Sequence, residues 1–177
     1  MTAPAEQPAV KARFIAFEGG EGVGKSTQAK RLVAALAERG IEALLTREPG
    51  GTKGAEMIRK LLLDPPGTGW LVQAEAMLFA AARSDHVAKA IKPALISGSW
   101  VVCDRFVLSS RAYQGLAGGL GDEEVWVWSG GRACARECIV LERRVSGLAS
   151  MCQRMRWVDG WRLGRLFRSC VATGCRT

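Results

Sequence analysis

Residues 19–26, GGEGVGKS, have the residue types and spacing of a phosphate-binding loop, G-x-x-x-x-G-K-[ST]. Glycines allow backbone angles that turn successive N–H groups toward phosphate oxygens. Lys25 would place a point charge on the β- and γ-phosphates, and the hydroxyl of Ser26 can ligate Mg²⁺. The alternative is a glycine-rich turn without function, but it leaves the lysine and the serine unexplained. The loop therefore predicts binding of a nucleoside triphosphate.

Further polar residues follow two other predicted strands. Arg47 comes directly after residues 41–46, and Asp104 ends residues 99–104 with Arg105 directly after it. Open α/β sheets bind ligands at the carboxyl ends of their strands, and planar arginine forks suit a monophosphate. A surface ion pair between Asp104 and Arg105 is the structural alternative. Loops that carry arginines beside a phosphate-binding loop can neutralise two polyanions at once. This arrangement favours transfer of a phosphoryl group from one polyanion to the other.

The elements that must position these residues alternate between strand and helix. Short apolar runs predict strands at 13–17, 41–46 and 99–104, and helical spacing predicts helices at 26–39, 54–63, 71–92 and 106–114. Gly40 is placed to end the first helix. Such alternation indicates a parallel sheet with helices on both faces. The expected fold is a three-layer α/β P-loop sandwich forming a single domain over residues 1–177.

The composition limits the class of protein. With 177 residues, 48% of them hydrophobic and 24% charged, the chain is expected to be globular rather than disordered or collagen-like. The sequence contains no run of 18 or more apolar residues, so it predicts no membrane span. Residues 1–10 lack the pattern of a secretory signal. A cytoplasmic location is therefore expected. The net charge of +8 is compatible with nucleic acid or phosphorylated small molecules as partners.

Residues 122–177 differ in composition from the rest of the chain. They hold ten Arg but no Lys, four of the six Trp and five of the six Cys. A disulfide framework is disfavoured in a cytosolic protein. A zinc site at Cys134 and Cys138 with Cys170 and Cys175 is a second hypothesis, although their spacing is wider than that of common zinc sites. A third hypothesis is translation of this segment out of frame.

Five blocks of sequence together resemble the thymidylate kinase family. They are FEGGEGVGKSTQ at 17–28, TREPGGT at 46–52, EAMLFAAAR at 75–83, DRF at 104–106 and SSRAYQG at 109–115. The resemblance covers about residues 13–121. It implies transfer of the γ-phosphoryl group of ATP to dTMP with Mg²⁺, as a step in dTTP biosynthesis. It also implies a homodimer.

The resemblance assigns roles to individual residues. The implied ATP site comprises Gly19, Gly20, Glu21, Gly22, Val23, Gly24, Lys25, Ser26 and Thr27, with Ser26 and Asp104 at the metal. The implied catalytic residues are Lys25, Asp104 and Arg105. In the acceptor site, Glu21 would meet the 3′-hydroxyl, Phe79 would stack on thymine, Arg83 would contact the base, Arg47 and Arg105 would hold the phosphate, and Tyr113 and Gln114 would line the pocket. Taken alone, Phe79 would be a core residue, although Arg83 shares its helix face.

The sequence departs from the family after residues 118–121. The family continues with a helix, a strand and a lid that carries arginines, and residues 138–142 with Arg143 or Arg144 are only loose substitutes. Without a lid we expect nucleotide binding with very slow transfer, because such an arginine contributes roughly 10³–10⁵ in rate. A sheet of three strands would also expose an unpaired edge.

Three alternatives therefore stay open from the sequence. The first is a chain that binds nucleotide without turnover, and the second is a P-loop protein whose Arg- and Trp-rich tail binds nucleic acid. The third is a kinase for another nucleoside monophosphate. Among the residues without an assigned role, His86 is expected on a helix surface, and Cys103 is expected to be a small buried side chain within a strand.

Overall fold

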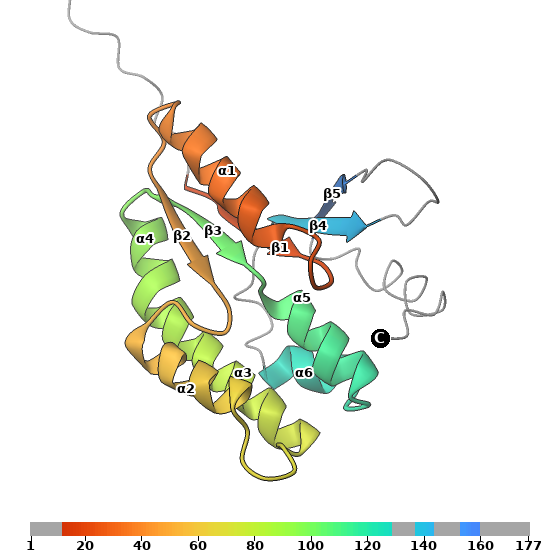
Figure 1. Ribbon diagram of the computed structural model, residues 1–177. Coiled ribbons are helices and arrows are strands. Elements are labelled where there is room, and N and C mark those ends of the chain that lie inside the picture. Colours follow the sequence, from red (N-terminus) through yellow and green to blue (C-terminus); the bar gives the residue numbers. More distant parts are fainter. Residues whose placement is uncertain (1–11, 129–136, 144–152, 160–177) are drawn as a thin grey trace, which may run out of the picture.

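The computed structural model describes residues 12–128, 137–143 and 153–159, and these form a five-stranded sheet with helices around it (Figure 1). The strand order is β2-β3-β1-β4-β5. The strands are β1 (Phe14–Glu18), β2 (Ala43–Arg47), β3 (Trp100–Asp104), β4 (Glu137–Arg143) and β5 (Gln153–Asp159). The first four run parallel, and β5 pairs antiparallel with β4.

The sheet corrects one expectation from the sequence. The sheet has five strands rather than the three expected, because β4 pairs with β1 in parallel, with Ala16 opposite Cys138. The segment 138–142, expected as a loose substitute for a family strand, lies within this strand. The pairing gives the backbone groups of β1 hydrogen-bond partners on both sides, as a central strand requires.

The helices follow the periodicity of the sequence closely. They are α1 (Lys25–Ala37), α2 (Lys53–Leu63), α3 (Val72–His86), α4 (Lys92–Ile96), α5 (Val107–Ser110) and α6 (Asp122–Trp128). The predicted helix at 71–92 is continuous, but a π-helical segment, η1 (Val87–Ile91), joins α3 to α4. A second π-helical segment, η2 (Arg111–Ala117), extends α5. Segments of this kind occur often at functional sites.

Two apolar clusters hold the helices against opposite faces of the sheet. Leu36 of α1 packs with Ile15, Phe17 and Val102. On the other face, Ala16, Val101 and Cys103 pack with Ile91 and with the start of α5. Alternate residues of β1 and β3 thus enter different clusters, as the period of two of a strand requires. The predicted three-layer α/β arrangement is confirmed, and it brings the ends of β1, β2 and β3 to one edge.

Two expectations concern membranes and metals. Within the described ranges, no helix is long and apolar enough to cross a membrane. The same residues contain no group of three or more His, Cys, Asp or Glu side chains arranged to hold a metal ion. Cys134, Cys170 and Cys175 lie outside the described residues. Most of segment 122–177, to which the out-of-frame hypothesis applies, also lies outside them.

Candidate active site

The phosphate-binding loop connects β1 to α1 in the predicted place. Gly22 and Gly24 have φ angles of +68° and +89°, in the left-handed region that glycine tolerates, and Gly24 caps the N-terminus of α1. The Nζ of Lys25 donates a hydrogen bond to the carbonyl of Gly20 at 2.5 Å, so the side chain folds back over the loop. Burial lowers the pKa of Lys25, and the neighbouring Arg105 lowers it further. The loop therefore concentrates positive charge at the N-terminus of a helix, where phosphate binds.

Ser26 and Asp104 meet at the edge of this loop. The hydroxyl of Ser26 donates to Oδ2 of Asp104, across 78 positions of sequence. A hydroxyl and a carboxylate oxygen side by side are ligands of the hard oxygen type that Mg²⁺ prefers. The two residues that the sequence predicts for a metal are thus brought together, and their chemistry fits the ion.

Arg105, which follows β3, has an unusual backbone conformation with φ +70°. Only glycine adopts this region without strain, so the surrounding structure must impose it. The N–H of Arg105 donates to the carbonyl of Phe17 at 2.9 Å, and its own carbonyl accepts from Sγ of Cys103 at 3.0 Å. The guanidinium then reaches Oε1 of Glu21 and the carbonyl of Gly19. Glu21 itself is 90% exposed, so this pair faces the open side of the loop.

Glu18 holds the turn at Arg105 in place, and the sequence did not mark Glu18 as a residue of the site. Its carboxylate is buried and accepts from the N–H groups of Phe106 at 2.9 Å and Leu108 at 3.1 Å, and from the hydroxyl of Ser109 at 2.6 Å. Burial raises the pKa of Glu18, while the hydrogen bonds from Ser109 and Phe106 oppose that rise. Glu18 thus holds the start of α5 next to Arg105. Its place at the end of a buried strand, directly before the glycine loop, was the available signal.

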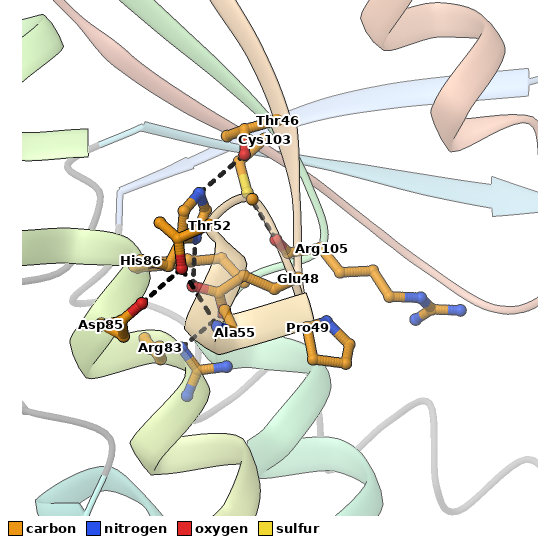
Figure 2. Close-up of polar contacts among 12 residues, drawn as sticks. Thr46, Glu48, Pro49, Thr52, Ala55, Arg83, Asp85, His86, Cys103 and Arg105 are labelled. Carbon is orange, nitrogen blue, oxygen red and sulfur yellow. Dashed lines mark hydrogen bonds and ion pairs between the residues drawn. The ribbon is translucent and has the colours of Figure 1, made fainter. Parts of the chain in front are cut away.

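The side of the site where the sequence predicts the acceptor is built on a buried ion pair. Nε of Arg83 donates to Oε2 of Glu48 at 2.6 Å, and both side chains are 4% exposed (Figure 2). Nη2 of Arg83 donates to the hydroxyl of Ser110 at 3.0 Å, and the guanidinium lies over the ring of Phe106. The third nitrogen, Nη1, is buried and has no hydrogen-bond partner among the described residues. Such a donor is costly unless a ligand meets it.

One face of α3 presents Phe79 between two polar contacts. Glu75, Phe79 and Arg83 are spaced four residues apart, so they lie on the same face of the helix. Nε2 of Gln114 donates to Oε1 of Glu75 at 2.6 Å, while Arg83 contacts Ser110, one turn before Gln114. Because a carboxylate only accepts, this contact fixes which end of the amide is nitrogen. Oε1 of Gln114 is then a buried acceptor without a partner in the described part of the chain.

His86 corrects a second expectation. The sequence predicts this residue on a helix surface, but its side chain is 0% exposed. Its Nδ1 lies 3.1 Å from Oε1 of Glu48, and its Nε2 lies 2.7 Å from the hydroxyl oxygen of Thr46 (Figure 2). A lone histidine three residues after Arg83 shares a helix face with that arginine, and this spacing was the signal. The expectation failed because Glu48, the partner that buries the ring, comes from a loop 38 positions earlier.

Two predicted substrate residues lie at the exposed edge of the site. Arg47, at the end of β2, is half exposed and pairs with Glu56 of α2 at 3.3 Å. Tyr113 is 47% exposed, and the guanidinium of Arg105 lies 5.6 Å from the centre of its ring. No contact between Arg47 and Arg105 is found in the described chain. Cys103 is fully buried, and burial raises the pKa of its thiol, as a structural role predicts.

Comparison with known proteins shows which family has this arrangement of residues. The model of the family described as thymidylate kinase matches residues 17–134. The chain belongs to the thymidylate kinase family. Among its relatives, the thymidylate kinase of Rhizorhabdus wittichii is 65% identical over 113 residues, 64% of this chain and 54% of the relative. That of Symbiobacterium thermophilum is 57% identical over 107 residues, 60% of this chain and 50% of the relative.

A solved structure supports the same assignment at the level of the fold. The crystal structure of thymidylate kinase from Ehrlichia chaffeensis superposes with a TM-score of 0.69 at 36% identity, covering 74% of this chain and 71% of that one. The fold is thus that of the P-loop kinases, as predicted. The chain spans about half the length of the curated relatives it matches. The comparisons give no support to a chain that only binds nucleotide or to a tail that binds nucleic acid.

Proposed function

We propose that the chain transfers the γ-phosphoryl group of ATP to dTMP, giving dTDP and ADP. The bond between the γ-phosphorus and the β,γ-bridging oxygen breaks, and a new bond forms to an oxygen of the dTMP phosphate. Its family membership and its intact phosphate-binding loop support this reaction. The same proposal gives the chain a role in dTTP biosynthesis and a cytoplasmic location, where ATP is available.

The observation that carries the choice of acceptor is two buried polar atoms, one on Arg83 of α3 and one on Gln114 of η2. Nη1 of Arg83 is an unpartnered donor, and Oε1 of Gln114 is an unpartnered acceptor, among the described residues. Thymine offers the complementary pair on one edge, an acceptor at O4 and a donor at N3. Cytosine presents a donor at N4 and an acceptor at N3, so the same site would leave four groups mismatched. We propose that Phe79 stacks on the ring between these two contacts.

The phosphate groups would lie among the cations at the sheet edge. Lys25 would contact the β- and γ-phosphates, and Arg105 and Arg47 would hold the acceptor phosphate. Glu21, paired with Arg105, would accept from the 3′-hydroxyl of the acceptor, and Tyr113 would line the sugar pocket. Ser26 and Asp104 would hold Mg²⁺, which neutralises charge on the transferring group when bound. The side chains of the chain supply position and charge, which is most of what phosphoryl transfer needs.

A homodimer is part of the proposal. Several apolar side chains on the α2–α3 pair are exposed, including Met57 at 69%, Leu61 at 48% and Met77 at 56%. Burial of such side chains against a second copy would remove apolar surface from water. Light scattering coupled to size-exclusion chromatography tests this part, and a monomer at all concentrations would contradict it.

The direct test is an ADP-release assay on the full chain with ATP, Mg²⁺ and an acceptor. We expect turnover with dTMP, weaker turnover with dUMP, which has the same polar edge without the methyl group, and almost none with dCMP or AMP. Binding of ATP and dTMP without turnover would contradict the proposed activity. Equal turnover with dTMP and dCMP would contradict the proposed roles of Arg83 and Gln114 and favour another nucleoside monophosphate kinase.

A further inference from the structure

We infer that His86 is a positioning residue for the acceptor pocket, acting on Arg83 through Glu48. This inference rests on the proposed function, because it concerns the residue that would contact the base. His86 closes a chain of contacts that runs from Thr46 on β2, through the imidazole, to the carboxylate of Glu48 and on to Arg83 (Figure 2). No other histidine occurs in the sequence.

The direction of the hydrogen bonds follows from the chemistry of the partners. An ionised carboxylate only accepts, so Nδ1 of His86 must carry the proton that lies toward Oε1 of Glu48. In the neutral ring, Nε2 is then an acceptor, and the hydroxyl of Thr46 donates to it. The two oxygens of Glu48 are thereby divided, Oε1 to His86 and Oε2 to Arg83. A carboxylate fixed at both oxygens cannot rotate, so it holds the guanidinium in one plane.

The ring has little freedom to move. It is 0% exposed, and a methyl group built on Gly51 would lie 2.5 Å from its Nε2, so the loop after β2 passes directly over it. The backbone of the same loop is tied to β3, since the N–H of Glu48 donates to the carbonyl of Asp104 at 3.0 Å. Both the ring and the carboxylate are therefore locked by packing, which is the condition for precise positioning.

The consequence concerns Nη1 of Arg83. Two of the three guanidinium nitrogens are held, Nε by Glu48 and Nη2 by Ser110, and the third is the unpartnered donor proposed to meet the base. If Glu48 loses its contact with His86, its carboxylate can turn, and Arg83 follows. We therefore expect His86 to influence the affinity for the acceptor but not the affinity for ATP, which binds at the other loop.

Two substitutions separate the two contacts of the ring. The amide nitrogen of His86→Asn occupies the position of Nδ1 and can still donate to Glu48, whereas that of His86→Gln occupies the position of Nε2 and can reach only Thr46. Calorimetry on the full chain with dTMP should give a Kd for His86→Asn within about threefold of the unmodified chain. For His86→Gln it should be weaker by about tenfold or more, as expected for a hydrogen bond to a charged group. The Kd for ATP should be unchanged in both.

A purely structural role predicts a different result. Both variants would then lower the melting temperature and weaken dTMP to the same extent, or would leave dTMP binding unaffected. Either result overturns the inference. Thr46→Val removes the hydroxyl on the other side of the ring without changing shape. We expect it to weaken dTMP binding less than His86→Gln does, because Nδ1 can still donate to Glu48, and an equal or greater loss would overturn the inference.

A spectroscopic measurement tests the inference without nucleotide and without a variant. With ¹⁵N-labelled histidine, the imidazole nitrogens give a single pair of signals, because the sequence contains one histidine. We expect Nδ1 of His86 to carry a proton in the unmodified chain. A neutral ring protonated only at Nε2 would overturn the inference, because such a ring cannot donate to Glu48. Failure of the unmodified chain to bind dTMP would instead refute the proposed function.

Discussion

The two halves of the site use different physical means to reach the same end. The phosphate-binding half is one continuous stretch of chain, in which glycines take left-handed backbone angles and Lys25 folds back over the loop. The acceptor half is assembled from separate segments, and it depends on charged side chains that are almost completely buried, Glu48 and Arg83 above all. Backbone groups bind any phosphate, whereas side chains can distinguish one base from another.

This difference also separates the costs of building each half. A glycine loop needs unusual backbone angles but leaves its N–H groups near solvent. A buried carboxylate and guanidinium lose their hydration, which their attraction repays only when the geometry and the remaining hydrogen bonds are good. We therefore expect substitutions in the first half to affect mainly the rate, and substitutions in the second half to affect stability and acceptor binding.

Removal of the loop lysine should have the largest effect. Lys25→Met is expected to lower the rate of phosphoryl transfer by about 10²–10³, the loss typical of one preorganised charge in a transition state. Affinity for dTMP should change little, because the acceptor half is intact. Steady-state kinetics and calorimetry measure the two quantities. Lys30→Met on the exposed side of α1 is the control, and an equal loss in both variants would show that Lys25 has no special role.

Breaking the buried ion pair should have the next largest effect. Glu48→Gln leaves the charge of Arg83 buried without a counter-charge, and the free energy of unfolding should fall by about 3–5 kcal/mol. Glu56→Gln removes the partner of Arg47 in an exposed pair and should cost less than about 1 kcal/mol. Urea denaturation of both variants provides the measurement. Similar losses would mean that burial gives the Glu48–Arg83 pair no greater weight in stability than the exposed Arg47–Glu56 pair.

The unpartnered amide sharpens the comparison within the acceptor half. Gln114→Leu removes the buried acceptor proposed for the N3–H of thymine, so dTMP should bind about tenfold more weakly while ATP binding is preserved. Calorimetry on each nucleotide separates these effects. Gln73→Leu, an exposed position at the start of α3, is the matched control. Unchanged dTMP affinity in Gln114→Leu would remove this amide from the proposed base site.

The smallest expected effect is a dependence of the free energy of unfolding on pH, caused by the titration of Glu18. Its folded-state pKa is raised above the ordinary value of 4.5, so between these two values the folded chain holds a proton that the unfolded chain has released. The contribution of Glu18 to the free energy of unfolding therefore decreases as pH rises through this window. Glu18→Gln keeps an acceptor for the N–H groups of Phe106 and Leu108 and can donate to Ser109, but it does not titrate.

The measurement is the difference in unfolding free energy between the unmodified chain and Glu18→Gln at several pH values above 4. We expect this difference to fall as pH rises, by less than about 1.4 kcal/mol for each pH unit. A difference that is constant, or that grows with pH, would contradict a raised pKa at Glu18. The turn at Arg105 should be preserved in the variant, so the rate of transfer at neutral pH provides the matching control.

The sequence could predict the phosphate half because that half is local. Residues 19–26 determine the loop, and the flanking apolar runs determine the strand before it and the helix after it. The acceptor half could not be predicted to the same depth, because its key contact joins Glu48 to Arg83 and His86 across 35 and 38 positions. His86 looked like a surface residue because nothing near it in sequence offers a buried polar partner. Likewise, β4 was expected only loosely, since pairing with β1 depends on a long connection.

The position of Asp104 in the sheet has a consequence for the spacing of the two loops. This residue ends β3, which lies between β1 and β2, so one strand separates the phosphate-binding loop from the loop that carries Glu48. Two strand spacings amount to about 9–10 Å, a span fixed by the hydrogen bonds of the sheet. Under the proposed function, the sheet would set the distance between the two nucleotides, and α3 and η2 would set the choice of base. An engineer who seeks a different acceptor can redesign those helices and leave the span between the phosphates as it is.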